Sequence, residues 1–238
     1  MSSRGRSFVL VAGAVVCAGM GLWQLFRLEN RRAAIRPAVA ALKLPVASLD
    51  DPVEAALAER AGLDFRRVSV TGRYDHAAEI VIRDQHSGTT AGVRIVTPLR
   101  LLRGDSAILV QRGFVPARDV RSVMLAKLEE SGVRQVSGVA LLQPDNAAGD
   151  PVEHDGVVTW REVDIPAIRA RLPYPVLGFV VRQLPDPSLP ELPRRESPPP
   201  LSDGPYLLYA ILWFSLAVAA LVSGVFRGLR PEAGTEPA

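Results

Sequence analysis

Cysteine is nearly absent from the chain, since Cys17 is the only one among 238 residues. An intramolecular disulfide and a CxxC motif are therefore excluded, and one chain cannot build a metal site from thiolates. Histidine is almost as rare: His76, His86 and His154 lie far apart and show no ligand spacing. We expect each of them on the surface or in a turn.

Recognisable catalytic motifs are also missing. The sequence has no nucleotide-binding loop, zinc-protease helix or nucleophile elbow. Asp75, Glu79 and Asp84 lie near the ends of predicted strands, where a carboxylate is usually a solvated surface charge. Because no nucleophile, base and orienting group occur at a recognisable spacing, we expect a protein that is not an enzyme.

Lysine is the third scarce residue, with only Lys43 and Lys127, so nearly all of the basic charge is arginine. Together with abundant alanine, glycine and proline, this bias favours a bacterial source with a GC-rich genome. The arginines are spread along the chain, whereas a nucleic-acid-binding protein gathers them on one face. With a net charge of only +3, the sequence predicts no nucleic-acid partner.

Charge is absent from two long apolar stretches, 8–26 and 206–226. At about 1.5 Å per helical residue, each is long enough to cross a hydrocarbon core of roughly 30 Å. We therefore predict a two-pass protein of the bacterial plasma (inner) membrane, in contact with membrane lipid. Its expected parts are a cytoplasmic tail, a transmembrane helix, an extracytoplasmic domain, a second transmembrane helix and a cytoplasmic tail, at 1–7, 8–26, 27–205, 206–226 and 227–238.

The first apolar stretch also has features of a secretory signal, because Arg4 and Arg6 precede it. Its only small-x-small site, at 12–14, lies too early for a signal peptidase, and the segment 23–27 offers no small pair. We therefore expect an uncleaved anchor.

The charges that flank the two stretches predict opposite orientations of the chain in the membrane. Four arginines within 27–36 favour an external amino terminus, whereas Asp203 before the second stretch and Arg227 and Arg230 after it favour internal termini. Long translocated segments are poorly governed by their charges. We expect both termini in the cytoplasm and the domain outside.

Small residues recur within both stretches. Gly13, Cys17 and Gly21 lie four residues apart, and Ala220 and Gly224 repeat the spacing. This pattern puts small side chains on one face, where a second helix can approach closely. Two interpretations remain open, because small residues are also common in membrane helices that do not pair.

The segment between the stretches predicts an α+β domain, mainly an antiparallel β-sheet or open barrel with peripheral helices. Asp51 and Gly62 are expected to begin and end a helix, and Asp164 to cap a short one. A helix is also expected at 120–128, a loop at 143–156 and a proline-rich extended tether at 184–205. Alternation predicts strands at 68–74, 79–83, 93–101, 107–115, 133–142, 157–160 and 177–182.

Arg112 and Gly113 in one predicted strand allow two interpretations. Gly113 can permit a bulge where the strand bends, which is a structural role. Alternatively, Arg112 faces an acidic partner.

Five segments in order resemble the motifs of one family. The family patterns are LGxWQxxR, VxVxGxF/Y, GxxVxTPL, LVNRGWVP and YAxxWF. The matching segments are GLWQLFR at 21–27, VSVTGRY at 68–74, GVRIVTPL at 92–99, LVQRGFVP at 109–116 and YAILWF at 209–214. The chain thus resembles the surfeit-locus family of cytochrome c oxidase assembly proteins over nearly its whole length.

The resemblance implies two membrane helices with the domain on the outer face. It also implies a role in assembling haem-copper cytochrome c oxidase, by assisting haem a delivery or insertion into the largest subunit. Its expected partners are cytochrome c oxidase subunit I and haem a biosynthesis proteins. One departure concerns haem a as a cofactor: the family usually carries histidine three residues before the Tyr-Ala pair, where this chain has Tyr206.

Tyr206, Tyr209 and Trp213 are expected to share one helix face. One interpretation is an aromatic belt at the water interface, together with Trp23 of the other stretch. The sharper hypothesis is that this face borders haem a and that Arg27 meets an acidic group at the membrane surface. The competing function is an envelope scaffold or interaction protein unrelated to respiration.

Overall fold

A computed structural model describes residues 3–118, 123–143, 151–154, 157–198 and 201–228. The chain divides into two compact units, and each is described by itself. One unit combines residues 1–37 with 200–238, and the other comprises residues 38–199.

The first unit is a hairpin of two helices, α1 (Ser3–Lys43) and α4 (Tyr206–Gly228). Both are long and apolar enough to cross a membrane, with mean hydropathies of 2.0 and 2.1 in their most apolar windows. α1 continues well beyond the predicted span of 8–26. Its continuation, 27–43, is rich in arginine and alanine, which favour helix.

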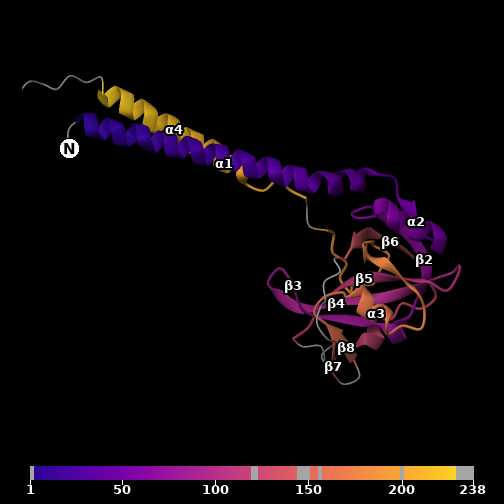
Figure 1. The fold of residues 1–238 in the computed structure, drawn as a ribbon. Coiled ribbons are helices and arrows are strands. Elements are labelled where there is room, and N and C mark those ends of the chain that lie inside the picture. The colour runs from indigo at the N-terminus through magenta and orange to yellow at the C-terminus, as the bar shows by residue number, and fades with distance from the viewer. Residues whose placement is uncertain (1–2, 119–122, 144–150, 155–156, 199–200, 229–238) are drawn as a thin grey trace, which may run out of the picture. The chain divides into compact units, whose positions relative to one another are not determined.

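α1 and α4 lie side by side (Figure 1). Buried positions on α1 recur every seven residues at Ala14, Gly21 and Leu28, and Gln24 is buried between them. Those on α4 recur at the same interval, at Ala210, Ala217 and Gly224. A seven-residue repeat is the signature of a helix pair that stays in register along its length.

The glycines at these buried positions, here called the seam, explain the close approach of the helices. A Cβ atom on Gly21 would lie 2.8 Å from the Phe214 ring, and one on Gly224 would lie 3.3 Å from the Leu10 Cβ. Helix pairing is thus confirmed, but Gly13 was wrongly assigned to the seam. No atom lies within 4 Å of a Cβ at Gly13, and Ala14 takes its place on the buried face.

The hairpin can be tested by cross-linking. We expect Leu10→Cys and Gly224→Cys, combined in a Cys17→Ser background, to form a disulfide on mild oxidation. The Cβ separation of 3.3 Å at this pair is close to the value of about 3.8 Å in disulfides. Loss of reactivity toward a maleimide-polyethylene glycol reagent measures the bond. Gly13→Cys with Gly224→Cys is the matched control, which should stay reduced; equal oxidation of both pairs would contradict this packing.

The described residues of the second unit, here called the β domain, form nine strands and a few short helices. In chain order these are β1 (Ala47–Ser48), α2 (Pro52–Gly62), β2 (Arg67–Tyr74), η1 (His76–Ala78), β3 (Ile80–Ser87), β4 (Thr90–Leu101), β5 (Ala107–Pro116), η3 (Leu125–Leu128), β6 (Val133–Leu142), β7 (Val152–His154), β8 (Val157–Trp160), α3 (Ile165–Arg169) and β9 (Val176–Gln183).

The central strands form a closed barrel. The sheet order is β1-β2-β6-β9-β5-β4-β3-β8-β7, and an additional pairing of β2 with β4 closes the ring β2-β6-β9-β5-β4. Most neighbouring strands are antiparallel, whereas β1–β2, β5–β9 and β3–β8 are parallel. The predicted α+β class with a mainly antiparallel domain is therefore confirmed, and the barrel is closed by β2 and β4.

Gly72 makes that closure possible. Residues 67–73 of β2 pair with β6 on one side, and residues 72–74 pair with 99–101 of β4 on the other. A Cβ at Gly72 would lie 2.8 Å from the Leu99 side chain and would collide with the Arg100 carbonyl oxygen. Only glycine therefore lets the two strands approach at this corner.

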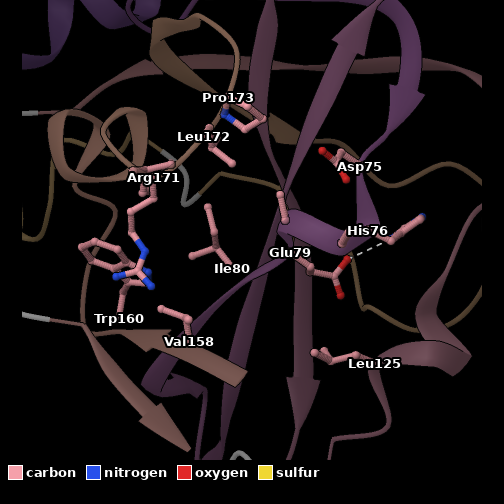
Figure 2. Close-up of a pocket in the computed structure, with 13 residues that line it drawn as sticks. Asp75, His76, Glu79, Ile80, Leu125, Val158, Trp160, Arg171, Leu172 and Pro173 are labelled. Atoms are coloured by element: carbon pink, nitrogen blue, oxygen red, sulfur yellow. Dashed lines mark hydrogen bonds and ion pairs between the residues drawn. The ribbon is translucent and has the colours of Figure 1, made fainter. Parts of the chain in front are cut away.

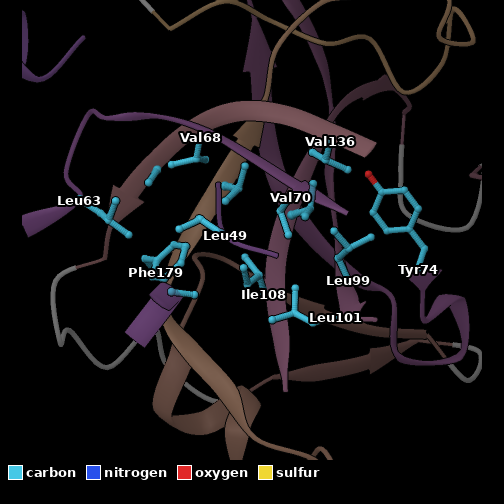
Figure 3. Packing of buried hydrophobic residues seen from close by; sticks show 14 residues of the cluster. Leu49, Leu63, Val68, Val70, Tyr74, Leu99, Leu101, Ile108, Val136 and Phe179 are labelled. Atoms are coloured by element: carbon cyan, nitrogen blue, oxygen red, sulfur yellow. The ribbon is translucent and has the colours of Figure 1, made fainter. Parts of the chain in front are cut away.

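The inside of the barrel is filled by apolar side chains. Leu63 and Phe179 lie toward one end and Tyr74 toward the other (Figure 3). The members of this cluster are Leu49, Ala55, Leu63, Val68, Val70, Tyr74, Leu99, Leu101, Ile108, Val110, Val136, Ala140, Phe179 and Val181. A second cluster packs α3 and β8 against the outside of the barrel through Trp160, Ile165 and Ile168.

The predicted helix caps are confirmed. Asp51 accepts hydrogen bonds from the backbone N–H groups of Val53 and Glu54, and Asp164 accepts one from Ala167. Such caps satisfy N–H groups that lack partners within the helix.

Three connecting segments differ from expectation. The helix expected at 120–128 is a 3-10 turn, Leu125–Leu128, and residues 119–122 lie outside the described chain. The expected loop at 143–156 contains strand β7, while 144–150 and 155–156 are not described. The expected tether packs on the β domain as far as residue 196. Arg194 and Phe114 exchange backbone hydrogen bonds of 2.9 and 2.7 Å, and Glu196 accepts a hydrogen bond from the Ser87 hydroxyl.

Candidate functional site

Arg27 joins the two helices of the hairpin through aromatic rings. Its guanidinium carbon lies 5.0 Å from the ring centre of Trp23 on α1 and 5.2 Å from that of Tyr206 on α4. Contacts of this kind contribute about 0.5–1 kcal/mol each at exposed sites. Three of the five predicted site residues are thus brought together by the antiparallel pairing of α1 and α4.

The other two predicted residues lie farther along α4. Tyr209 is exposed and Trp213 is partly exposed. The spacing of three and four residues places them on the same side of α4 as Tyr206, because neighbouring turns stack. The set therefore forms one aromatic stripe, as the sequence indicates, with Arg27 at its Tyr206 end.

The water-facing end of the hairpin is held by two further arginines. Arg32 forms an ion pair of 2.8 Å with Asp203, and Arg31 donates to the Ser202 carbonyl oxygen at 3.5 Å. Both members of the ion pair are more than 40% exposed, so its contribution is small. In the described chain Arg27 has no carboxylate partner, and the predicted contact with an acidic group at the membrane surface stays a prediction.

The hairpin is a poor fit for haem held by a protein ligand. All three histidines belong to the β domain, and Tyr206 could ligate iron only as a phenolate. One face of the Tyr206 ring is already covered by Arg27. No group of three or more His, Cys, Asp and Glu side chains that could hold a metal ion occurs among the described residues. What the stripe offers is flat aromatic surface beside one cation.

Sequence reasoning missed the most unusual site in the β domain, a buried charge cluster of Glu79, Arg112, Glu130 and Arg195. At least 96% of each side chain is removed from solvent. The cluster closes the barrel at the end marked by Tyr74, whose ring centre lies 5.0 Å from the Arg112 guanidinium. Two positive and two negative charges balance within it.

Arg112 lies at a bulge of β5. Ile95 of β4 pairs with Gly113 and Val96 pairs with Gln111, so Arg112 is an extra residue between them. It continues the inward row of Ile108 and Val110. The structural interpretation of the Arg112-Gly113 pair is therefore confirmed, and the acidic groups that Arg112 faces belong to its own chain.

Arg112 and Glu79 form the first half of the cluster. The Arg112 Nη1 donates to the Glu79 Oε2 at 3.0 Å. The same oxygen accepts from the Thr97 hydroxyl at 2.8 Å and lies 3.1 Å from the His76 Nδ1. The His76 Nε2 accepts from the backbone N–H of Glu130 at 3.0 Å. Because that nitrogen is an acceptor, the ring proton belongs on Nδ1, facing Glu79.

Glu130 and Arg195 form the other half. The Glu130 Oε1 accepts from the Arg112 Nη2 at 2.8 Å and also from the Arg195 Nη2. Arg195 further donates to the Gln183 Oε1 at 3.1 Å and to the carbonyl oxygens of Pro190 and Pro193 at 3.0 and 2.9 Å. The proline-rich segment is thus fastened to the barrel by a buried ion pair.

The surroundings of Glu130 favour its ionised form. Burial raises the pKa of its carboxyl, but the hydrogen bonds and charges of Arg112 and Arg195 outweigh burial and leave that pKa below its ordinary value. The ionised carboxylate therefore stabilises the fold at neutral pH, and this contribution is lost as the pH falls through the lowered pKa. Burial also raises the pKa of Tyr74, so that the phenol stays neutral.

One expectation from the sequence is wrong here: Glu79 is predicted to be a solvated surface charge, but its side chain is 4% exposed. His76 lies in a turn as expected, with a side chain that is 16% exposed. Strand-end position alone cannot reveal burial, because the cluster is assembled from strand β5 and three connecting segments that are distant in sequence. Asp84, by contrast, is exposed as expected.

A cavity of about 450 Å³ lies beside the cluster. Figure 2 shows Asp75, His76 and Glu79 along one side of it and Trp160 and Arg171 along the other, with Ile80 between them. Asp75 accepts a 2.6 Å hydrogen bond from the Tyr174 hydroxyl. An apolar wall with a few convergent polar groups is the usual form of a small binding site, and here His76 and Glu79 connect it to the charge cluster.

Comparison with known proteins gives a consistent result. The model of the SURF1 family matches residues 11–218, from α1 through the β domain into α4. A SURF1-like protein of Monosiga brevicollis is 29% identical over 242 residues, which cover 97% of this chain and 89% of that protein. A SURF1-like protein of Rickettsia felis is 21% identical over 91% of this chain and 93% of its own length.

Animal relatives match over a shorter part. Surfeit locus protein 1 of Homo sapiens is 27% identical over 179 residues, covering 68% of this chain and 57% of that protein. The chain therefore spans a little over half of the human relative, but nearly all of the bacterial one.

Proposed function

Because the chain belongs to the SURF1 family, we propose that it is a membrane-anchored assembly factor for haem-copper cytochrome c oxidase. In this proposal it assists delivery or insertion of haem a into the largest subunit. Its partners would be cytochrome c oxidase subunit I and the proteins of haem a biosynthesis. The observation that carries the proposal is the family match over residues 11–218.

The motif residues support this role through what they build. Trp23 and Arg27 of the first motif make the contacts that join α1 to α4. Gly72 of the second closes the barrel, and Arg112 of the fourth anchors the charge cluster. These residues hold a scaffold together, which suits a factor that positions other molecules better than an enzyme with its own chemistry.

The hairpin suits an assembly role within the plane of the membrane. Two apolar helices fit a membrane protein, and we propose that it resides in the bacterial plasma membrane, with both termini in the cytoplasm and the β domain outside. A factor anchored in this way meets its partner in the same bilayer, where the aromatic stripe and Arg27 are presented to neighbouring helices or lipid.

Haem a enters this proposal as cargo. The stripe of Tyr206, Tyr209, Trp213 and Trp23 would lie against the flat face of the macrocycle, and Arg27 would attract a carboxylate at its edge. Absence of a haem absorbance band from the purified protein, with oxidase assembly intact, would contradict this contact between the stripe and haem a.

Deletion of the gene tests the proposed function. We expect the membranes of the deletion strain to lose most of their cytochrome c oxidase activity and of the haem a in their absorption spectrum. Re-expression of the intact chain should restore both. A tagged chain should also co-purify with a complex that contains subunit I.

The outcome that contradicts the proposal is full oxidase activity with normal haem a content in the deletion strain. That result would favour the alternative of an envelope scaffold unrelated to respiration. The binding partners of such a scaffold would then be identified from the complex that co-purifies with the tagged chain.

A further inference from the structure

The outside of the barrel carries a polar patch next to the apolar cluster under α3. Val96, Leu109 and Val180 belong to that cluster and lie on β4, β5 and β9. Because side chains alternate along a strand, the residues two positions away share the same face. On these three strands they are Arg94, Gln111 and Arg182.

Arg182 is an arginine of this patch that is partly withdrawn from water. Its side chain is partly buried and its Nε is fully buried. It makes no hydrogen bond and no ion pair within the described chain. Burial lowers the pKa of Arg182 and the charge of Arg94 lowers it further, which Glu196 opposes. A cation withdrawn from water without a partner costs free energy.

Arg94 is only partly paired. Its Nη1 donates to the Gln85 Oε1 at 2.5 Å, and its Nη2 lies 3.4 Å from the Glu196 Oε2. Its Nε is buried and unbonded within the described chain. The other oxygen of Glu196 accepts from the Ser87 hydroxyl, so this carboxylate is held at the edge of the patch.

The charges of the patch do not balance. Arg94 and Arg182 carry two positive charges, and Glu196 supplies one negative charge. This differs from the charge cluster at the end of the barrel, where two arginines meet two glutamates. The patch therefore carries one excess positive charge, at a partly exposed position on the strands of the barrel.

We propose that Arg182, with Arg94 and Gln111 beside it, binds one carboxylate group from outside the chain. A planar carboxylate with a single charge matches the fork of a guanidinium group and removes the excess charge. The group is either the free carboxylate of a small acid or the side chain of an acidic residue in a partner protein. This site is independent of the proposed role in oxidase assembly.

Anion-dependent thermal stability of the full-length protein in detergent tests the proposal. Sodium acetate replaces sodium chloride at constant ionic strength and neutral pH, and circular dichroism follows unfolding. We expect the midpoint to rise by about 3 °C and then saturate, because ligand binding stabilises the folded state. N-acetylglutamate N-methylamide, which presents the carboxylate as a protein does, is titrated in parallel.

Two variants decide the result. Arg182→Gln should abolish the saturating rise of the unfolding midpoint. The rise is measured for each variant against the midpoint of the same variant in chloride. Arg103→Gln changes an exposed arginine in the β4–β5 loop and should keep the rise. Saturation by acetate alone identifies a small acid, and saturation by the glutamate derivative alone identifies an acidic side chain. Absence of saturation with both compounds, or an equal rise in Arg182→Gln, overturns the proposal.

Discussion

Replacement of Arg112 by methionine is expected to lower the free energy of unfolding by about 3–5 kcal/mol. The substitution keeps an apolar stem of similar length but removes the cation between Glu79 and Glu130. Both carboxylates are at least 96% buried, and Glu79 then keeps only Thr97 and His76 as hydrogen-bonding neighbours. Urea unfolding of the full-length protein in detergent, followed by circular dichroism, measures the loss.

The same change at Arg103 provides the matched control. Arg103 is exposed, so Arg103→Met should alter stability by no more than about 0.5 kcal/mol. Lowering the pH toward 4.5 should reduce the difference in unfolding free energy between Arg112→Met and the wild type, because protonation neutralises the unpaired carboxylates. If this difference does not change with pH, the lost stability comes from packing and not from charge.

Replacement of Gly113 by alanine is expected to lower the free energy of unfolding by about 3 kcal/mol or more. The backbone has φ of +150° at this residue, and a Cβ would lie 2.7 Å from the Arg194 carbonyl carbon. Because the obstacle is backbone, the segment that carries Arg194 and Arg195 must move away. Arg195 would then leave Glu130, so a single methyl group disturbs both the bulge and the charge cluster.

Gly132 separates the two causes of this loss. Its φ is +83°, but a Cβ there would have no atom within 4 Å. Gly132→Ala therefore reports backbone strain alone, at about 1–2 kcal/mol. Equal unfolding free energies for the two variants would show that contact with Arg194 is unimportant. Limited proteolysis should cut the proline-rich segment faster in Gly113→Ala only.

The two helices and most strands follow from local pattern. An uncharged run of about twenty residues has few alternatives to a membrane helix, and alternating apolar residues predict the faces of β2, β4 and β6. Asp51 and Asp164 begin their helices because a carboxylate followed by free N–H groups is a local arrangement. Each of these features depends on neighbours within one or two turns of the chain.

Closure of the barrel is a different kind of feature. It requires β2 to pair with both β6 and β4, and Gly72 allows the close approach. A glycine within a strand indicates a bulge or a close contact, but the sequence does not say which strand comes near. The same holds for Gly21 and Gly13, which look alike in the sequence and differ only in whether α4 lies against them.

The sequence by itself determined the hairpin, the strand order along the chain and the residues that mark the family. Only the tertiary structure decided that Glu79 is buried and His76 partly buried, and that Arg112 is neutralised by two glutamates. It also decided that Arg182 makes no hydrogen bond or ion pair with the described residues. The physical reason is that charge pairing and desolvation depend on groups brought together from distant strands. A charged residue looks the same in sequence whether water or another side chain surrounds it.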